Sequence, residues 1–65
     1  MSRALDIQIL KDMVKKCPEG KEADLVITLL LLGFNLNCRT YKKVLLEEFK
    51  KRQTRLPDWL ERKLR

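Results

Sequence analysis

Basic side chains at helical spacing are the residues of this 65-residue chain best suited to binding chemistry. Residues 39–65 contain ten basic and four acidic side chains, whereas residues 1–38 contain five of each. The formal charge of +6 therefore arises entirely in the C-terminal part. Because clustered Lys and Arg side chains attract phosphate groups, this distribution indicates a strongly anionic ligand, and nucleic acid is the first candidate.

The basic residues fall into two groups by their position along one predicted helix. At 3.6 residues per turn, Arg39, Lys43 and Lys50 share the face opposite the apolar side. The residues at the exposed start of this helix are Arg39, Thr40, Lys42 and Lys43. Those further along are Lys50, Lys51, Arg52 and Arg55.

The same residues also fit an ordinary solvated helix surface. Glu47 precedes Lys51 by four residues, and Glu48 precedes Arg52 by four, which is the favourable order for ion pairs along a helix. Such pairs would neutralise part of the basic run and weaken the field that a phosphate meets. At the level of the sequence, both interpretations stay open.

Residue types that carry out catalysis or bind metals are scarce. The chain has no histidine, and no obvious base accompanies Cys17 or Cys38. A zinc site would need two carboxylates or a second chain in addition to these thiols. We therefore expect a protein that is not an enzyme, that has no metal, cofactor or small-molecule substrate, and whose cysteines are free thiols.

The sequence shows no sign of a targeting or membrane-spanning segment. It does not open with a basic-then-apolar leader. The longest apolar stretch, residues 25–34, is about half of the ~20 residues needed to cross a bilayer. We expect an intracellular protein, cytoplasmic or nuclear, without a membrane partner.

Four helices are expected to position the basic residues. Apolar residues recur at helical spacing over residues 3–16, 22–32, 38–54 and 56–65, with the third helix beginning at either Cys38 or Tyr41. Asn37 and Thr40 are both suitable N-caps for this third helix, and Pro57 suits the first position of the fourth. Gly33 suits the left-handed residue that follows the second helix.

Residues 25–32, with four consecutive leucines, have almost no polar face. A helix that is apolar all round normally lies in the interior, so the second helix is predicted to be the central element, covered on most sides. A buried strand is the alternative, but the lack of alternation favours a helix. The chain is thus expected to form one all-α domain over residues 1–65, a bundle of three or four helices.

The centre of the chain combines an apolar helix, a glycine turn and a basic helix. The segments that carry this pattern are Leu32-Gly33-Phe34-Asn35 and residues 38–45. They resemble the helix-turn-helix family of DNA-binding domains, in which the second helix enters the major groove. The chain departs from the compact pattern by the insertion Leu36-Asn37 and by Leu29, where a small residue is usual. The resemblance implies double-stranded DNA as the ligand and a dimer that presents two basic helices. It also implies that the residues at the start of the third helix meet base edges and phosphates, and that those further along meet phosphates, which would make binding fall steeply with salt.

Two other features indicate protein partners instead. Residues 24–37 look like the second helix and outgoing turn of an ankyrin repeat, which implies an adaptor, but no Thr-Pro-Leu-His segment and no second copy occur. The C-terminal helix could also dock onto a larger protein, with Trp59, Leu60 and Leu64 as contact residues. Closure of the intramolecular core by these side chains is the alternative. So small a core favours self-association or a larger partner in either case.

Overall fold

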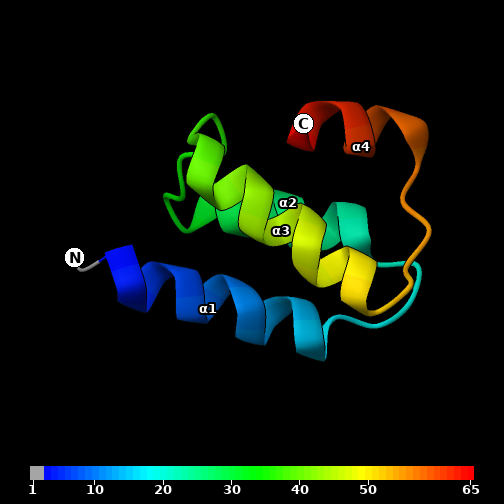
Figure 1. The fold of residues 1–65 in the computed structure, drawn as a ribbon, viewed down its shortest axis with the longest axis horizontal. Helices are drawn as coiled ribbons and strands as arrows, with labels where there is room; N and C mark the ends of the chain where they lie inside the picture. Colours follow the sequence, from blue (N-terminus) through cyan, green and yellow to red (C-terminus); the bar gives the residue numbers. More distant parts are fainter. Residues whose placement is uncertain (1–2) are drawn as a thin grey trace.

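The computed structural model describes residues 3–65, and all regular structure within this range is helical. The helices are α1 (Arg3–Lys16), α2 (Glu22–Leu31), α3 (Arg39–Lys51) and α4 (Asp58–Leu64), as Figure 1 shows. The prediction of a small all-α bundle is confirmed. The bounds of α1 agree with those expected from its apolar spacing.

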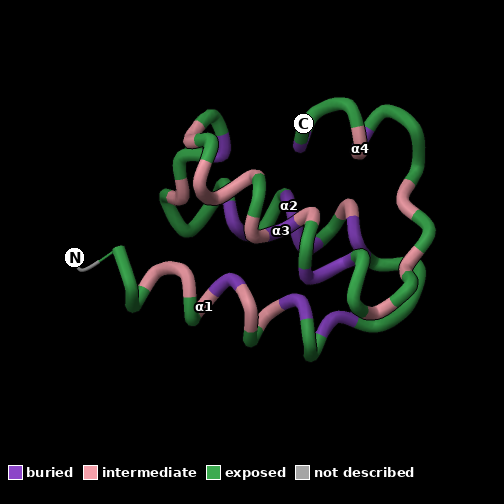
Figure 2. Tube along the Cα trace, viewed as in Figure 1, coloured by how far each residue is buried: buried purple, intermediate pink, exposed green. Residues whose placement is uncertain are grey.

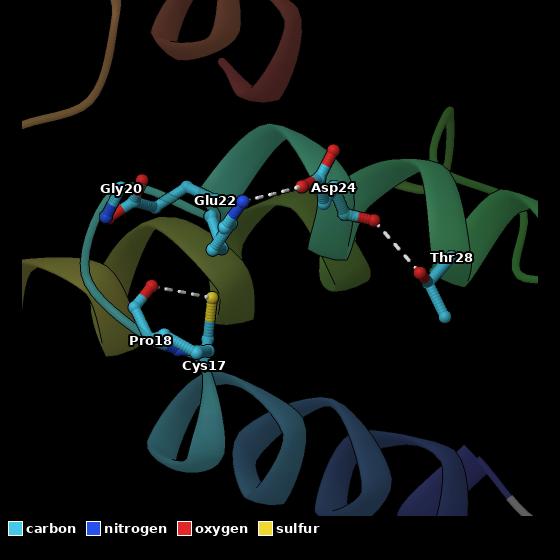
Figure 3. A network of polar contacts seen from close by, with 7 residues as sticks. Cys17, Pro18, Gly20, Glu22, Asp24 and Thr28 are labelled. Carbon is cyan, nitrogen blue, oxygen red and sulfur yellow. Dashed lines mark hydrogen bonds and ion pairs between the residues drawn. The ribbon is translucent and has the colours of Figure 1, made fainter.

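The turn between α1 and α2 closes through local polar contacts (Figure 3). Gly20 has a φ of +88°, which favours glycine, and its backbone N–H donates to the carboxylate of Glu22 over 3.1 Å. The Cys17 thiol donates to the Pro18 carbonyl oxygen over 3.4 Å. Glu22 is buried, and a buried carboxylate is costly to desolvate. The hydrogen bond from the Gly20 N–H provides a partner for it.

Helix α2 ends in a Schellman motif. Gly33 has a φ of +93°, its N–H donates to the Leu30 carbonyl oxygen, and the Phe34 N–H donates to that of Leu29, each over 3.1 Å. These bonds satisfy carbonyl groups that the helix end leaves without intrahelical partners. The left-handed conformation predicted for Gly33 is confirmed.

Helix α3 ends with the same hydrogen-bond pattern but without glycine. Gln53 has a φ of +58°, and its N–H donates to the Lys50 carbonyl oxygen over 2.9 Å. The Thr54 N–H donates to the Phe49 carbonyl oxygen over 3.0 Å. The left-handed residue stops the helix at Lys51, three residues before the predicted end.

The starts of α3 and α4 differ from the predicted caps. Cys38, with extended backbone angles, occupies the N-cap position of α3, so Asn37 and Thr40 were both wrong as predicted N-caps. Asn35 instead accepts a hydrogen bond from the Asn37 N–H over 3.0 Å, which stabilises a turn before the helix. Pro57 is the N-cap residue of α4 and not its first helical residue.

Helix α3 lies at the centre of the fold, with α1 packed along one side and α4 against another (Figure 1). Phe34 and Tyr41 add an edge-to-face aromatic pair with ring centroids 5.8 Å apart. The buried apolar core draws on all four helices and the two loops before α2 and α3: Leu10, Val14, Cys17, Leu25, Val26, Leu29, Leu36, Leu45, Phe49, Leu60 and Leu64.

The prediction that the leucine-rich helix α2 is covered on most sides was wrong. One stripe of α2 is buried, with Leu25, Val26 and Leu29 in the core (Figure 2 shows the burial pattern along the chain). The other large apolar side chains of α2, and that of its C-cap residue Leu32, are exposed: Ile27, Leu30, Leu31 and Leu32. A small domain offers α2 neighbours on one side only, so an all-apolar helix leaves its second side in water.

Candidate nucleic-acid interface

Helix α3, α4 and the segment between them line a groove of about 950 Å³. Its apolar lining consists of Leu46, Phe49, Leu56 and Leu64. Phe49 and Leu64 also belong to the buried core. Six basic side chains also line the groove: Arg39, Lys42, Lys43, Lys50, Arg55 and Arg65. Three acidic ones do so as well: Glu47, Asp58 and Glu61. With six positive and three negative charges, this basic groove carries a formal charge of +3.

Five of the eight nucleic-acid contacts predicted from the sequence line the basic groove: Arg39, Lys42, Lys43, Lys50 and Arg55. Residues 3–65 contain three ion pairs, which join Lys21 to Asp24, Lys51 to Glu48 and Arg65 to Glu61. None of the five predicted cations takes part in them. Their charges are therefore not neutralised by direct contact with a carboxylate in the described part of the chain.

The ion pairs predicted for an ordinary salt-bridged surface do not form between residues 47 and 52. Lys51 Nζ lies 3.0 Å from a carboxylate oxygen of Glu48, one turn earlier, and makes no pair with Glu47. Glu48 is buried, so this pair provides the main charge partner for its carboxylate. Lys51 does not line the basic groove, and neither does half-buried Thr40.

Arg52 is directed to α1 and not to the groove. Its guanidinium donates hydrogen bonds to the carbonyl oxygens of Val14 and of Cys17, the latter over 2.7 Å. These carbonyls belong to the C-terminal end of α1, where the helix dipole favours a cation. Because Arg52 connects the end of α3 to the end of α1, we remove it from the predicted phosphate contacts.

The predicted partner-binding residues of α4 divide between core and surface. Leu60 and Leu64 have no exposed surface and close the hydrophobic core, which is the alternative that the sequence left open for them. Trp59, by contrast, has 56% of its surface exposed. Of the three predicted contact residues of α4, Trp59 is the one that a docking protein can reach.

Sequence reasoning missed the part of the groove that α4 and its approach contribute. Neither Leu56 nor Arg65 is among the contact residues that the sequence predicts. Both line the basic groove because α4 folds back against α3. Arg65 also pairs with Glu61 over 3.3 Å, which reduces the charge it contributes. No sequence signal indicates this approach, since it depends on the path of residues 52–57.

The cysteines and the tyrosine occupy distinct electrostatic environments. Both thiols are free, as predicted. Burial, followed by the nearby charge of Glu22, raises the pKa of Cys17, whereas the backbone N–H of Tyr41 lowers the pKa of Cys38. The Tyr41 hydroxyl donates to Asp6 over 2.9 Å, and this hydrogen bond raises the pKa of the tyrosine. The bond connects α3 to α1 on the side away from the groove residues.

Other site types receive no support from the described residues. No group of three or more Cys, Asp or Glu side chains within residues 3–65 is placed to hold a metal ion. None of the four helices in that range is both long and apolar enough to cross a membrane. No family model, curated protein or solved structure matches the chain, and the basic groove is therefore assigned from its own geometry.

Proposed function

We propose that this chain is a non-enzymatic DNA-binding protein with a regulatory role, and that the basic groove receives the phosphate backbone of double-stranded DNA. The observation that supports the proposal is the convergence of five cations without ion-pair partners on one groove: Arg39, Lys42, Lys43, Lys50 and Arg55. Self-association, which would present two such grooves to one duplex, is part of the proposal.

Each part of the groove suits a part of the duplex. Lysine and arginine side chains that are hydrated and unpaired release condensed counterions when they meet phosphates, and this release favours binding. Arg39, the first residue of α3, can offer a guanidinium fork to guanine at the groove edge. Leu46 and Leu56 are half-buried and offer apolar contact to sugars or to the methyl group of thymine.

The connection between α2 and α3 bears on how α3 approaches DNA. It comprises residues 32–38, of which Leu36 is buried, and it is longer than the turn of three or four residues in a compact helix-turn-helix. We therefore propose docking along the whole basic groove, with residues of α3 and of the segment before α4 in contact with phosphates.

The first experiment is a fluorescence-anisotropy titration of a labelled random duplex of about 20 base pairs at two salt concentrations. If each of the five cations meets one phosphate, the logarithm of the affinity falls with the logarithm of salt concentration with a slope of roughly −4.5. Between about 50 and 200 mM salt this slope corresponds to a loss of about 500-fold in affinity. Absence of binding at the lower concentration would contradict the proposal.

A pair of charge-matched variants locates the site. Reversal of Arg39, Lys42 and Lys43 to Glu changes the formal charge from +6 to 0, and so does reversal of Lys15, Lys16 and Lys21, which do not line the groove. We expect the first variant to lose duplex binding and the second to retain most of it. Equal losses would show that net charge alone drives binding. Circular dichroism confirms that both variants are folded.

The exposure of Trp59 favours a second candidate function, docking onto a larger protein through α4. Aromatic side chains contribute strongly to the energies of protein interfaces, and Trp59 does not line the basic groove. The Trp59→Ala variant separates the two functions. It should bind the duplex as well as the wild type does, and lose binding to a protein partner that docks on α4.

A further inference from the structure

The exposed side of α2 forms a second apolar stripe, separate from the one in the core. Ile27, Leu30, Leu31 and Leu32 have 53%, 47%, 82% and 60% of their surface exposed, and we call them the outer α2 face. Ile27, Leu30 and Leu31 follow the i, i+3, i+4 spacing by which one helix packs against another. A helix with this pattern on its solvent side has the surface of a packed helix, but no helix within residues 3–65 covers that side.

The outer α2 face lies in an uncharged stretch of the sequence, and exposed Lys21 and Asp24, which pair with each other, border its start. Residues 25–38 contain no charged side chain, although 24 of the chain's 65 residues are charged. The Thr28 hydroxyl, near the face, donates to the Asp24 carbonyl oxygen of its own helix over 2.9 Å (Figure 3). The hydroxyl hydrogen is thus bonded within α2, and a partner can cover the face without leaving this donor unsatisfied.

We propose that the outer α2 face binds the same face of a second copy of this chain. A protein of charge +6 repels its own copies, and residues 25–38 are the longest uncharged segment through which two copies can approach. A partner chosen by its acidic charge would gain nothing at this neutral face. An identical apolar face is complementary to it in character, and a two-fold axis makes every contact occur twice.

The surface available is sufficient for a weak dimer. The four side chains expose roughly 400 Å² of apolar area per chain, which is comparable with the largest apolar patch of a typical monomer. Complete burial of these side chains in both copies would remove roughly 800 Å², which is below the ~1,200 Å² of the smallest stable interfaces and corresponds to a weak, transient dimer.

The charges at the start of α2 decide the orientation of the two copies. A parallel pair would bring Lys21 next to the partner's Lys21 and Asp24 next to the partner's Asp24. In an antiparallel pair these residues face the uncharged segment after the partner's α2, and the two helix dipoles are opposed, which is favourable. Ile27 of one copy then packs against Leu31 of the other.

The interface leaves the basic groove open, because no residue of the outer α2 face lines it. The self-association surface is therefore independent of the ligand that the groove binds. A failure of duplex binding would leave the dimer proposal intact, whereas a protein that stays monomeric would remove the self-association part of the proposed function and leave duplex binding by a single groove to be tested.

Sedimentation equilibrium of the wild-type protein over about 1–500 μM tests the proposal. We expect the mass to rise from 7.8 kDa toward twice this value over that range. The Leu31→Lys variant, whose altered side chain is the most exposed of the four, should fold normally and dimerise at least 100-fold more weakly.

Two matched variants carry the same change at exposed apolar residues elsewhere. Leu5, in α1, and Trp59, in α4, have 55% and 56% of their surface exposed, close to the value for Ile27. Leu5→Lys and Trp59→Lys should leave the dimerisation constant within about threefold of the wild-type value. A wild-type protein that stays at 7.8 kDa throughout, or a Leu31→Lys variant that dimerises like the wild type, would overturn the proposal.

Discussion

Helices α2 and α3 contrast in composition and in their place in the fold. Between Glu22 and Leu31, α2 is the most apolar helix, yet it leaves one side in water. Between Arg39 and Lys51, α3 carries seven charged residues among thirteen, yet it is the central helix, packed against α1 and α4. The position of a helix in a small bundle thus follows from how sharply its apolar and polar sides are separated, and less from its mean hydropathy.

The separation of sides explains what each helix contributes. On α3, Leu45 and Phe49 lie in the core while Lys43 and Lys50 stay in water, so one helix both organises the fold and presents the basic groove. On α2, the buried stripe stabilises the fold, and the second apolar stripe contributes nothing to the core of the single chain. Substitutions on the core side and on the solvent side of each helix test this difference between α2 and α3.

The largest effect is expected when a side chain is removed from the core side of α3. Phe49 has 1% of its surface exposed, so Phe49→Ala should lower the free energy of unfolding by about 3–5 kcal/mol, enough to abolish cooperative unfolding in so small a domain. Leu31→Ala on the outer side of α2 should change it by less than about 0.5 kcal/mol. Urea denaturation followed by circular dichroism, at a concentration where the chain is monomeric, measures both.

A substitution on the buried side of α2 shows whether the loss of stability depends on the side of the helix or on which helix is altered. Leu29 has no exposed surface, and Leu29→Ala should cost about 2–5 kcal/mol although it alters the same helix as Leu31→Ala. If the two leucine substitutions had equal effects, the two sides of α2 would be equivalent and the contrast with α3 would be wrong.

An intermediate effect is expected at the contact between α3 and α1. Arg52→Met removes hydrogen bonds from a charged donor to the carbonyl oxygens of Val14 and Cys17, and it should lower the free energy of unfolding by about 1.5–3 kcal/mol. Lys50→Met, which removes an exposed and unpaired cation from the same helix, should change it by less than about 0.5 kcal/mol. Equal values for the two variants in thermal or urea unfolding would show that Arg52 does not hold α1 to α3.

The smallest effects are expected at the two helix ends, where α2 and α3 share a hydrogen-bond pattern but not a residue type. Gly33→Ala should destabilise by about 1–2 kcal/mol through backbone strain alone, since an added Cβ would meet no atom within 4 Å. Gln53→Gly should stabilise by about 1 kcal/mol, because glycine accepts the positive φ that Gln53 already has. If the Gln53→Gly variant were less stable than the wild type, the contacts of the glutamine side chain would contribute more stability than the backbone strain at the positive φ removes.

The helices were predicted well because their signals are local. The spacing of Leu10 and Val14, the charges at the two ends of α1, and the positive φ at Gly33 depend on neighbours within a few residues. The end of α3 was missed because Gln53 adopts a left-handed conformation that glycine usually marks, and no glycine is present there. The N-cap at Cys38 was missed because its thiol is not a strong capping group.

Sequence by itself determined the four helices, the all-α class, and the concentration of positive charge after residue 38, since periodicity and composition are properties of the chain alone. Tertiary structure decided which side of each helix meets water. It placed α3 and not α2 at the centre, directed Arg52 to α1, buried Leu60 and Leu64, and brought Arg65 to the groove. These outcomes depend on contacts between residues far apart in the chain, where competition for a small core selects one packing among several that local patterns allow.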